Sequence, residues 1–98
     1  NPRALWAGIR DDRPVLHLQR KIETALQRIG LEAEERKFTP HVTLARLRAA
    51  PRERVATFLS THALYVSTPF DVNCFILYSS TLSSNGSLYR AERSYRLE

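Results

Sequence analysis

The spacing of hydrophobic and polar residues differs between successive segments of the chain. Residues 4–9 form a mostly apolar run that predicts a buried strand, and the acidic turn at residues 11–13 ends it. After this turn, apolar residues recur at intervals of three and four, which predicts an amphipathic helix with one buried face. That face consists of Val15, Leu18, Ile22, Leu26 and Ile29.

Residues that favour helix boundaries stand at both ends of this segment. Asp11 or Asp12 is placed to cap the N-terminus, and Pro14 suits the first turn, where a backbone N–H has no partner within the helix. Gly30 is placed to end the helix, because a left-handed backbone conformation costs glycine little.

The second half of the chain predicts one more helix and three more strands. Residues 41–47 alternate as a strand does and follow Pro40, and a shorter helix with Val55, Phe58 and Leu59 on its apolar side begins at Pro51. Strands at about residues 70–80 and 87–97 flank the polar turn 82–86, whose Asn-Gly pair indicates a hairpin.

The order β-α-β-α-β-β predicts an α+β fold. We expect residues 1–98 to form a single domain in which two helices cover one face of a mostly antiparallel sheet. The chain contains no methionine, so it is expected to be processed or to be a fragment of a longer polypeptide.

Charge and cysteine content narrow the range of partners. The formal net charge is +5, most of it from arginine, and guanidinium groups suit phosphate oxygens. This favours an anionic partner such as RNA or a nucleotide, although many basic domains are simply well solvated.

The only cysteine, Cys74, excludes an internal disulfide and favours an inert thiol in a reducing compartment such as the cytoplasm. No apolar run is long enough to cross a membrane.

One of the three histidines stands in a pattern that suits proton transfer. In a strand, His41 and Thr43 project to one side, while Val42 and Leu44 project to the other and are expected to be buried. Imidazole exchanges protons near neutral pH, and a neighbouring hydroxyl is able to donate to a phosphate oxygen. Judged by spacing alone, a half-exposed strand that shows His and Thr to water is the more common explanation.

The other two histidines have structural interpretations. His17 is expected on the surface of the first helix, and His62 ends the second helix, where an imidazole interacts favourably with the helix dipole.

Residues 38–46, Phe-Thr-Pro-His-Val-Thr-Leu-Ala-Arg, closely resemble the second His-x-Thr motif of the 2′–5′ RNA ligase family. These enzymes act as RNA 2′,3′-cyclic phosphodiesterases and belong to the 2H phosphoesterase superfamily. The resemblance extends to residues 5–8, which look like the strand that opens the second half of such proteins. It also extends to residues 75–80 with Gly86, residues 88–89 and Leu97, which are similar to their closing hairpin.

The resemblance implies a bilobal fold with one His-x-Thr motif in each lobe and a metal-free, cofactor-free reaction. His41 would be the general base, and the histidine of the other lobe would protonate the leaving 3′-oxygen of a 2′,3′-cyclic phosphate. Thr43 would hold a phosphate oxygen, and Arg46 matches the arginine that closes the motif. Strict alternation points the side chain of Arg46 away from that of His41. Arg46 binds phosphate only if a bulge or the end of the strand turns its side chain to the side of His41; otherwise it is a solvated surface arginine.

No second His-x-Thr occurs in the chain, since His17 precedes Leu18-Gln19 and His62 precedes Ala63-Leu64. The chain is therefore expected to be the C-terminal lobe, inactive alone, that assembles with the missing N-terminal lobe or another copy of itself. The alternative is a non-catalytic module that binds nucleotides or RNA.

Two further groups have functional and structural interpretations. The basic residues Arg48, Arg52 and Arg54 would suit an RNA backbone, but a solvated helix start explains them more simply. The aromatic residues would suit base stacking, yet most are better explained as core or half-buried strand residues. They are Trp6, Tyr65, Tyr78 and Tyr89.

Overall fold

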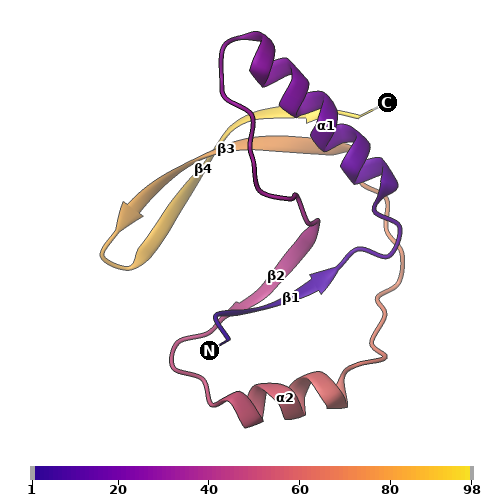
Figure 1. The fold of residues 1–98 in the computed structure, drawn as a ribbon, viewed down its shortest axis with the longest axis vertical. Coiled ribbons are helices and arrows are strands. Elements are labelled where there is room, and N and C mark those ends of the chain that lie inside the picture. Colours follow the sequence, from indigo (N-terminus) through magenta and orange to yellow (C-terminus); the bar gives the residue numbers. More distant parts are fainter. Residues whose placement is uncertain (1, 98) are drawn as a thin grey trace. The chain divides into compact units, whose positions relative to one another are not determined.

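The computed structural model describes residues 2–97 and confirms the predicted α+β class and element order (Figure 1). The elements are β1 (Ala4–Gly8), α1 (Arg13–Arg28), β2 (His41–Arg46), α2 (Arg52–Thr61), β3 (Cys74–Ser83) and β4 (Gly86–Arg96). All strand pairing is antiparallel, as predicted, and the strands are divided between two two-stranded sheets, β1–β2 and β3–β4.

The chain divides into two compact units, which we call unit 1 and unit 2. Unit 1 is Asn1–Ala63 and holds β1, α1, β2 and α2, whereas unit 2 is Leu64–Glu98 and holds the β3–β4 hairpin. The predicted arrangement of both helices on one sheet face stays a prediction. Within the described part of unit 1, β1 and β2 contact each other, and neither helix contacts a strand.

The N-terminus of α1 lies where the sequence predicts it, but the expected capping bond is replaced by a local ion pair. Asp12 is the N-cap residue, and its side chain makes no capping hydrogen bond. The carboxylate of Asp11 instead accepts from the Arg13 guanidinium at 3.0 Å and from its backbone N–H at 3.4 Å. The side-chain bond, with a smaller contribution from the backbone bond, holds the pKa of Asp11 below its ordinary value.

The C-terminus of α1 ends in the glycine-dependent manner that the sequence predicts. Gly30 has a φ of +102°, and its N–H donates to the carbonyl of Gln27 at 3.0 Å. The N–H of Leu31 donates to the carbonyl of Leu26 at 3.1 Å. These two bonds form a Schellman motif, which satisfies carbonyl groups that the helix leaves without partners.

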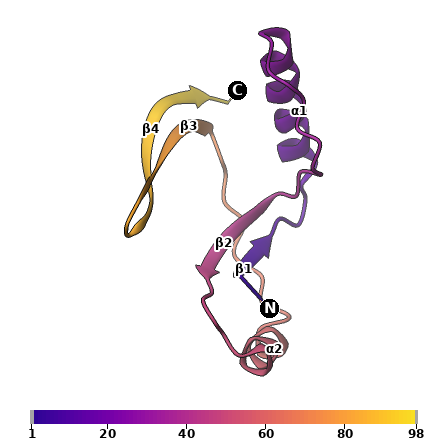
Figure 2. The same cartoon turned by 60° about the vertical axis from the view of Figure 1, so that its left-hand side comes forward.

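The β3–β4 hairpin confirms the predicted turn between the last two strands (Figure 2). Gly86 opens β4 with a φ of +108°, and the Ser83 hydroxyl donates to its carbonyl at 2.7 Å. At the other end of the hairpin, the stacked rings of Phe75 and Tyr95 lie 4.8 Å apart. The cross-strand stack adds to the backbone ladder that joins the strands.

Apolar side chains stay accessible throughout the described residues, none of which is buried. The apolar side of α1 is only half-buried at Val15, Leu18 and Ile22. The expected burial of Val42 and Leu44 is wrong, since these residues are 54% and 63% exposed. The physical reason is that neither helix of unit 1 lies close to the β1–β2 pair, so no helix covers Val42 or Leu44.

We predict that Gly30→Ala in the full-length protein lowers the free energy of unfolding by about 1–2 kcal/mol, because a Cβ disfavours the left-handed conformation. Urea unfolding curves measure the loss, and Gly30→Asn is expected to lose less because asparagine tolerates this region better. Equal stability of the alanine variant and the wild type would contradict the Schellman end of α1.

Candidate active site

The register of β1 and β2 brings His41 and Thr43 onto one face, as the sequence predicts. Gly8 lies opposite His41, and Trp6 lies opposite Thr43. Opposed residues of an antiparallel pair share a face, and residues two apart on β1 also share a face. We call the side that carries Trp6, His41 and Thr43 the His41 face.

A β-bulge brings Arg46 to the same face. Leu5 pairs with Ala45, but the next residue, Trp6, pairs with Thr43, so Leu44 is an extra residue on β2. A bulge residue shifts the alternation of its strand by one position. Arg46 consequently lies opposite Ala4, which is on the His41 face together with Trp6.

The imidazole of His41 is held by the backbone just before the strand. Its Nδ1 lies 2.7 Å from the carbonyl oxygen of Thr39. Because a carbonyl oxygen only accepts, this contact requires a hydrogen on Nδ1. In the neutral ring, Nε2 then carries the free lone pair and is the atom able to accept a proton. Sequence patterns did not indicate this contact, which depends on the backbone conformation at Thr39.

An indole ring lies beside this imidazole. The ring centroids of Trp6 and His41 are 5.3 Å apart with an interplanar angle of 54°, within the range of aromatic pairs. Trp6 is 52% exposed, so this large apolar ring stays accessible on the polar His41 face. Trp6 lies in the run that was expected to form a buried strand, and its exposure contradicts that expectation. The glycine two positions later was the available signal for its position.

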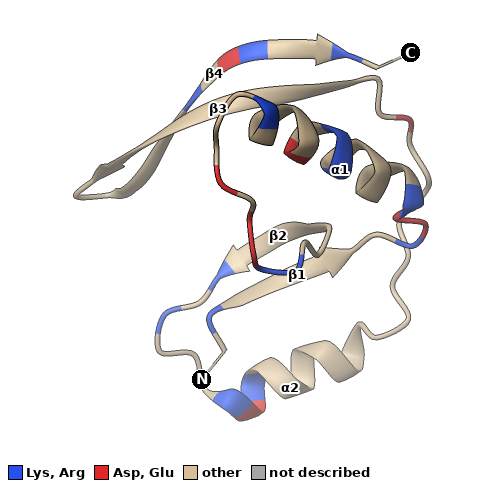
Figure 3. Ribbon diagram, turned by 45° about the horizontal axis from the view of Figure 1, so that its top comes forward, with Lys and Arg blue, Asp and Glu red and all other residues tan. Residues whose placement is uncertain are grey.

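Basic residues follow the end of β2 (Figure 3). Arg46 ends the strand, Arg48 lies in the connection, and Arg52 and Arg54 lie in the first turn of α2. Among the residues that the structure describes, the ion pairs are Arg13–Asp11, Arg36–Glu34 and Arg90–Glu92. Arg46 therefore forms no ion pair with a carboxylate among the described residues.

Comparison with known proteins assigns the family. The sequence profile described as LigT-like phosphoesterase matches residues 9–89, which include β2 and most of the hairpin. The chain belongs to the LigT-like phosphoesterase family. The predicted resemblance to 2H phosphoesterases is thereby confirmed.

Two curated relatives of this LigT-like phosphoesterase are named RNA 2′,3′-cyclic phosphodiesterase. The protein of Thermotoga maritima is 29% identical over 92% of the chain and 46% of its own length. The protein of Aquifex aeolicus is 29% identical over 98% of the chain and 52% of its own length. The chain thus spans about half the length of the curated relatives that it matches.

The remaining histidines of this LigT-like phosphoesterase lie on the helices. His17 is exposed on α1. His62 is the C-cap residue of α2; its N–H donates to the carbonyl of Phe58 at 3.1 Å, and its ring lies 4.5 Å from the Phe58 ring. Neither residue belongs to the His41 face, in agreement with their structural interpretation.

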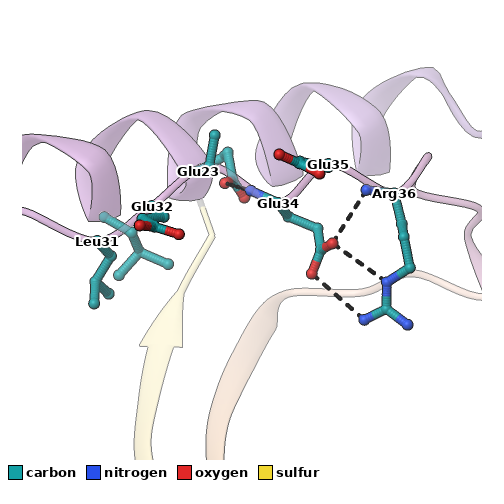
Figure 4. A pocket seen from close by; sticks show the side chains of 8 residues that line it. Glu23, Leu31, Glu32, Glu34, Glu35 and Arg36 are labelled. Carbon is teal, nitrogen blue, oxygen red and sulfur yellow. Dashed lines mark hydrogen bonds and ion pairs between the residues drawn. The ribbon is translucent and has the colours of Figure 1, made fainter.

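A hollow beside the C-terminal half of α1 is unsuited to phosphate. Its lining includes Glu23 and the acidic run at residues 32–35 (Figure 4). The Arg36 guanidinium donates to the Glu34 carboxylate at 3.3 Å, and this bond is the main cause of the lowered pKa of Glu34. The other carboxylates would repel an anion, so this hollow does not compete with the His41 face for a phosphoester.

Within residues 2–97, no group of three or more His, Cys, Asp or Glu side chains is arranged to hold a metal ion. Neither helix in this part of the chain has the length and apolar character that crossing a bilayer requires.

We predict that the neutral His41 ring is protonated at Nδ1, because only that nitrogen faces the Thr39 carbonyl. Long-range proton–nitrogen correlation spectra of the imidazoles in the full-length protein distinguish the two tautomers. His17 and His62 serve as internal references, since no hydrogen bond fixes either ring among the described residues. A predominant Nε2–H form at His41 would contradict the assignment of the free lone pair to Nε2.

Proposed function

We propose that this chain is the C-terminal lobe of an RNA 2′,3′-cyclic phosphodiesterase, which hydrolyses the cyclic phosphate to a 2′-phosphate. The observation that carries this proposal is the anchored His41 ring, with Nε2 free on the face that also carries Thr43 and Arg46. Membership of a phosphoesterase family and the names of the two relatives support it.

In the proposed reaction, His41 is the general base. Nε2 takes a proton from a water molecule as its oxygen bonds to phosphorus, while Nδ1 keeps its hydrogen bond to Thr39. The bond from phosphorus to the 3′-oxygen breaks, and a histidine of the other lobe protonates that oxygen. The products are a 2′-phosphate and a 3′-hydroxyl. If the 5′-hydroxyl of a second RNA replaced water as the nucleophile, the same groups would form a 2′–5′ linkage and release the 3′-hydroxyl.

Thr43 and Arg46 bind the phosphate in this scheme. The Thr43 hydroxyl donates to a non-bridging oxygen, and the Arg46 guanidinium stabilises the negative charge that develops as water attacks. Both residues lie on the His41 face. Because a histidine pair supplies the proton transfers and these groups balance the charge, the scheme needs neither a metal ion nor a cofactor.

The second histidine comes from outside the chain in this proposal. The chain contains no other His-x-Thr motif, and it spans about half the length of each relative. In this proposal, a further lobe lies against the His41 face and supplies that histidine. That lobe is the N-terminal half of the same enzyme or, failing that, another copy of this chain. The single reduced thiol, Cys74, suits a cytoplasmic enzyme.

The alternative is a module that binds RNA or nucleotides without turnover. It follows from the same basic residues after β2 and from the presence of one His-x-Thr motif instead of two. A partner lobe without a histidine at the matching position would leave the 3′-oxygen without a proton donor.

We predict that the full-length protein converts a short RNA with a 2′,3′-cyclic phosphate to the 2′-phosphate in the presence of a metal chelator. His41→Ala lowers kcat on the order of a hundred- to ten-thousand-fold, because the water loses its proton acceptor. Chromatography of the end-labelled RNA measures the product, and the chain of 98 residues alone gives no turnover.

The matched control for this experiment is His62→Ala, which removes an imidazole from α2 and leaves kcat unchanged. If the folded protein binds the RNA tightly but does not turn it over, the protein is a module that binds RNA or nucleotides and not a phosphodiesterase. Full activity of His41→Ala would show that His41 is not the general base and that the His41 face is not the active site.

We predict that Arg46→Ala lowers kcat/KM about ten- to a hundredfold, the loss expected for one charge-assisted hydrogen bond. The control Arg20→Ala removes the same charge from the exposed side of α1 and changes kcat/KM less than twofold, on the order of a surface-charge effect. Equal losses in the two variants would show that Arg46 acts only through the net charge.

A further inference from the structure

The indole of Trp6 is placed where a side chain opposite His41 would otherwise stand. Gly8 is the residue directly opposite His41, and it contributes no side chain to the His41 face. A Cβ added at Gly8 would lie 3.9 Å from Cζ3 of Trp6. The ring of Trp6 therefore lies over Gly8 and contacts the imidazole of His41, which is the diagonal neighbour of Trp6 on the paired strand.

The imidazole is thus held at two places. Its Nδ1 edge is fixed by the Thr39 carbonyl at 2.7 Å, and the ring is flanked by the indole at a centroid distance of 5.3 Å. The hydrogen bond restrains the ring at one edge, and contact with a broad aromatic surface opposes the small changes of the side-chain torsions that remain. Nε2 is the ring atom that these two contacts leave available.

Burial does not explain the position of Trp6. The ring is 52% exposed and lies on the polar face of the pair, on the opposite side from Leu5 and Ala7. A tryptophan that served the core would project with those apolar residues. Its side chain instead contacts the one residue of this face that is suited to proton transfer.

We propose that Trp6 is a positioning residue that orients the imidazole of His41, and that the absence of a large side chain at Gly8 leaves room for the indole. This inference rests on the proposed function for its kinetic consequences, but the orientation of the imidazole is testable without turnover. Trp6 touches no reacting atom in this proposal, and it acts only through His41.

The decisive variants are Trp6→Leu and Trp6→Phe in the full-length protein. Trp6→Leu lowers kcat about ten- to a hundredfold, the effect of a misplaced general base, and leaves KM within about twofold. Trp6→Phe restores most of kcat, because a smaller aromatic ring still flanks the imidazole. In nuclear magnetic resonance spectra, Trp6→Leu removes the ring-current shift of the His41 ring protons and reduces the preference for the Nδ1–H tautomer.

Substitutions at Gly8 test the same contact with Trp6 present. Gly8→Ala behaves like the wild type, because its Cβ meets the indole at an ordinary contact distance of 3.9 Å. Gly8→Val adds two methyl groups toward the indole and reproduces the loss of kcat and of the ring-current shift. This variant also keeps the proposal testable if Trp6→Leu does not fold.

The control variant is Phe58→Leu, which removes the aromatic partner of His62 in the same unit and leaves kcat and the His41 signals unchanged. A rise in KM at constant kcat in Trp6→Leu would identify Trp6 as a surface for the RNA base and overturn the proposal. An unchanged His41 spectrum in Trp6→Leu would overturn it as well. If the wild type has no turnover, the proposed function fails, and the spectra alone decide whether Trp6 orients the imidazole.

Discussion

The antiparallel pairing of β1 and β2, with Leu44 as an extra residue, determines which side chains share the His41 face. Gly8, Trp6 and Ala4 of β1 set three positions on that face. The extra residue of β2 lies between the partner of Trp6 and the partner of Ala4. Arg46, which pairs with Ala4, therefore lies on the same face as His41 and Thr43. A regular ladder would leave the guanidinium on the opposite side, so one extra residue brings the imidazole of His41 and the guanidinium of Arg46 onto one face.

The anchoring of His41 depends on the residues that precede the strand. Pro40 fixes its own φ and favours an extended Thr39, whose carbonyl then receives the Nδ1 hydrogen. The ladder holds the backbone of His41, the Thr39 carbonyl holds one edge of its ring, and Trp6 flanks the ring. Three different interactions therefore restrict a side chain that is otherwise exposed to solvent.

Features that depend on neighbouring residues in the sequence were predictable. The left-handed end of α1 at Gly30, the hairpin turn before Gly86 and the common side of His41 and Thr43 all follow from local pattern. The family resemblance was carried by residues 38–46, and the matching family profile includes them.

Features that depend on distant partners were not predictable. The sequence indicated that a bulge or the strand end was needed to bring Arg46 to the side of His41, but the position of the bulge at Leu44 is visible only when β1 is paired with β2. The contact between Trp6 and His41 is likewise visible only in the paired strands. The burial expected for Val42 depended on a covering surface that alternation alone does not supply.

The two strand pairs differ in how far apart their residues lie along the chain. A two-residue link, Ser84 and Asn85, joins β3 to β4, whereas α1 and its connections separate β1 from β2. Closing a longer loop costs more conformational entropy and slows folding. When the complete chain refolds, we therefore expect the hairpin to form first and the His41 face to assemble late. During synthesis, β1 must wait for α1 and β2 to emerge from the ribosome before the imidazole, the hydroxyl and the guanidinium come together.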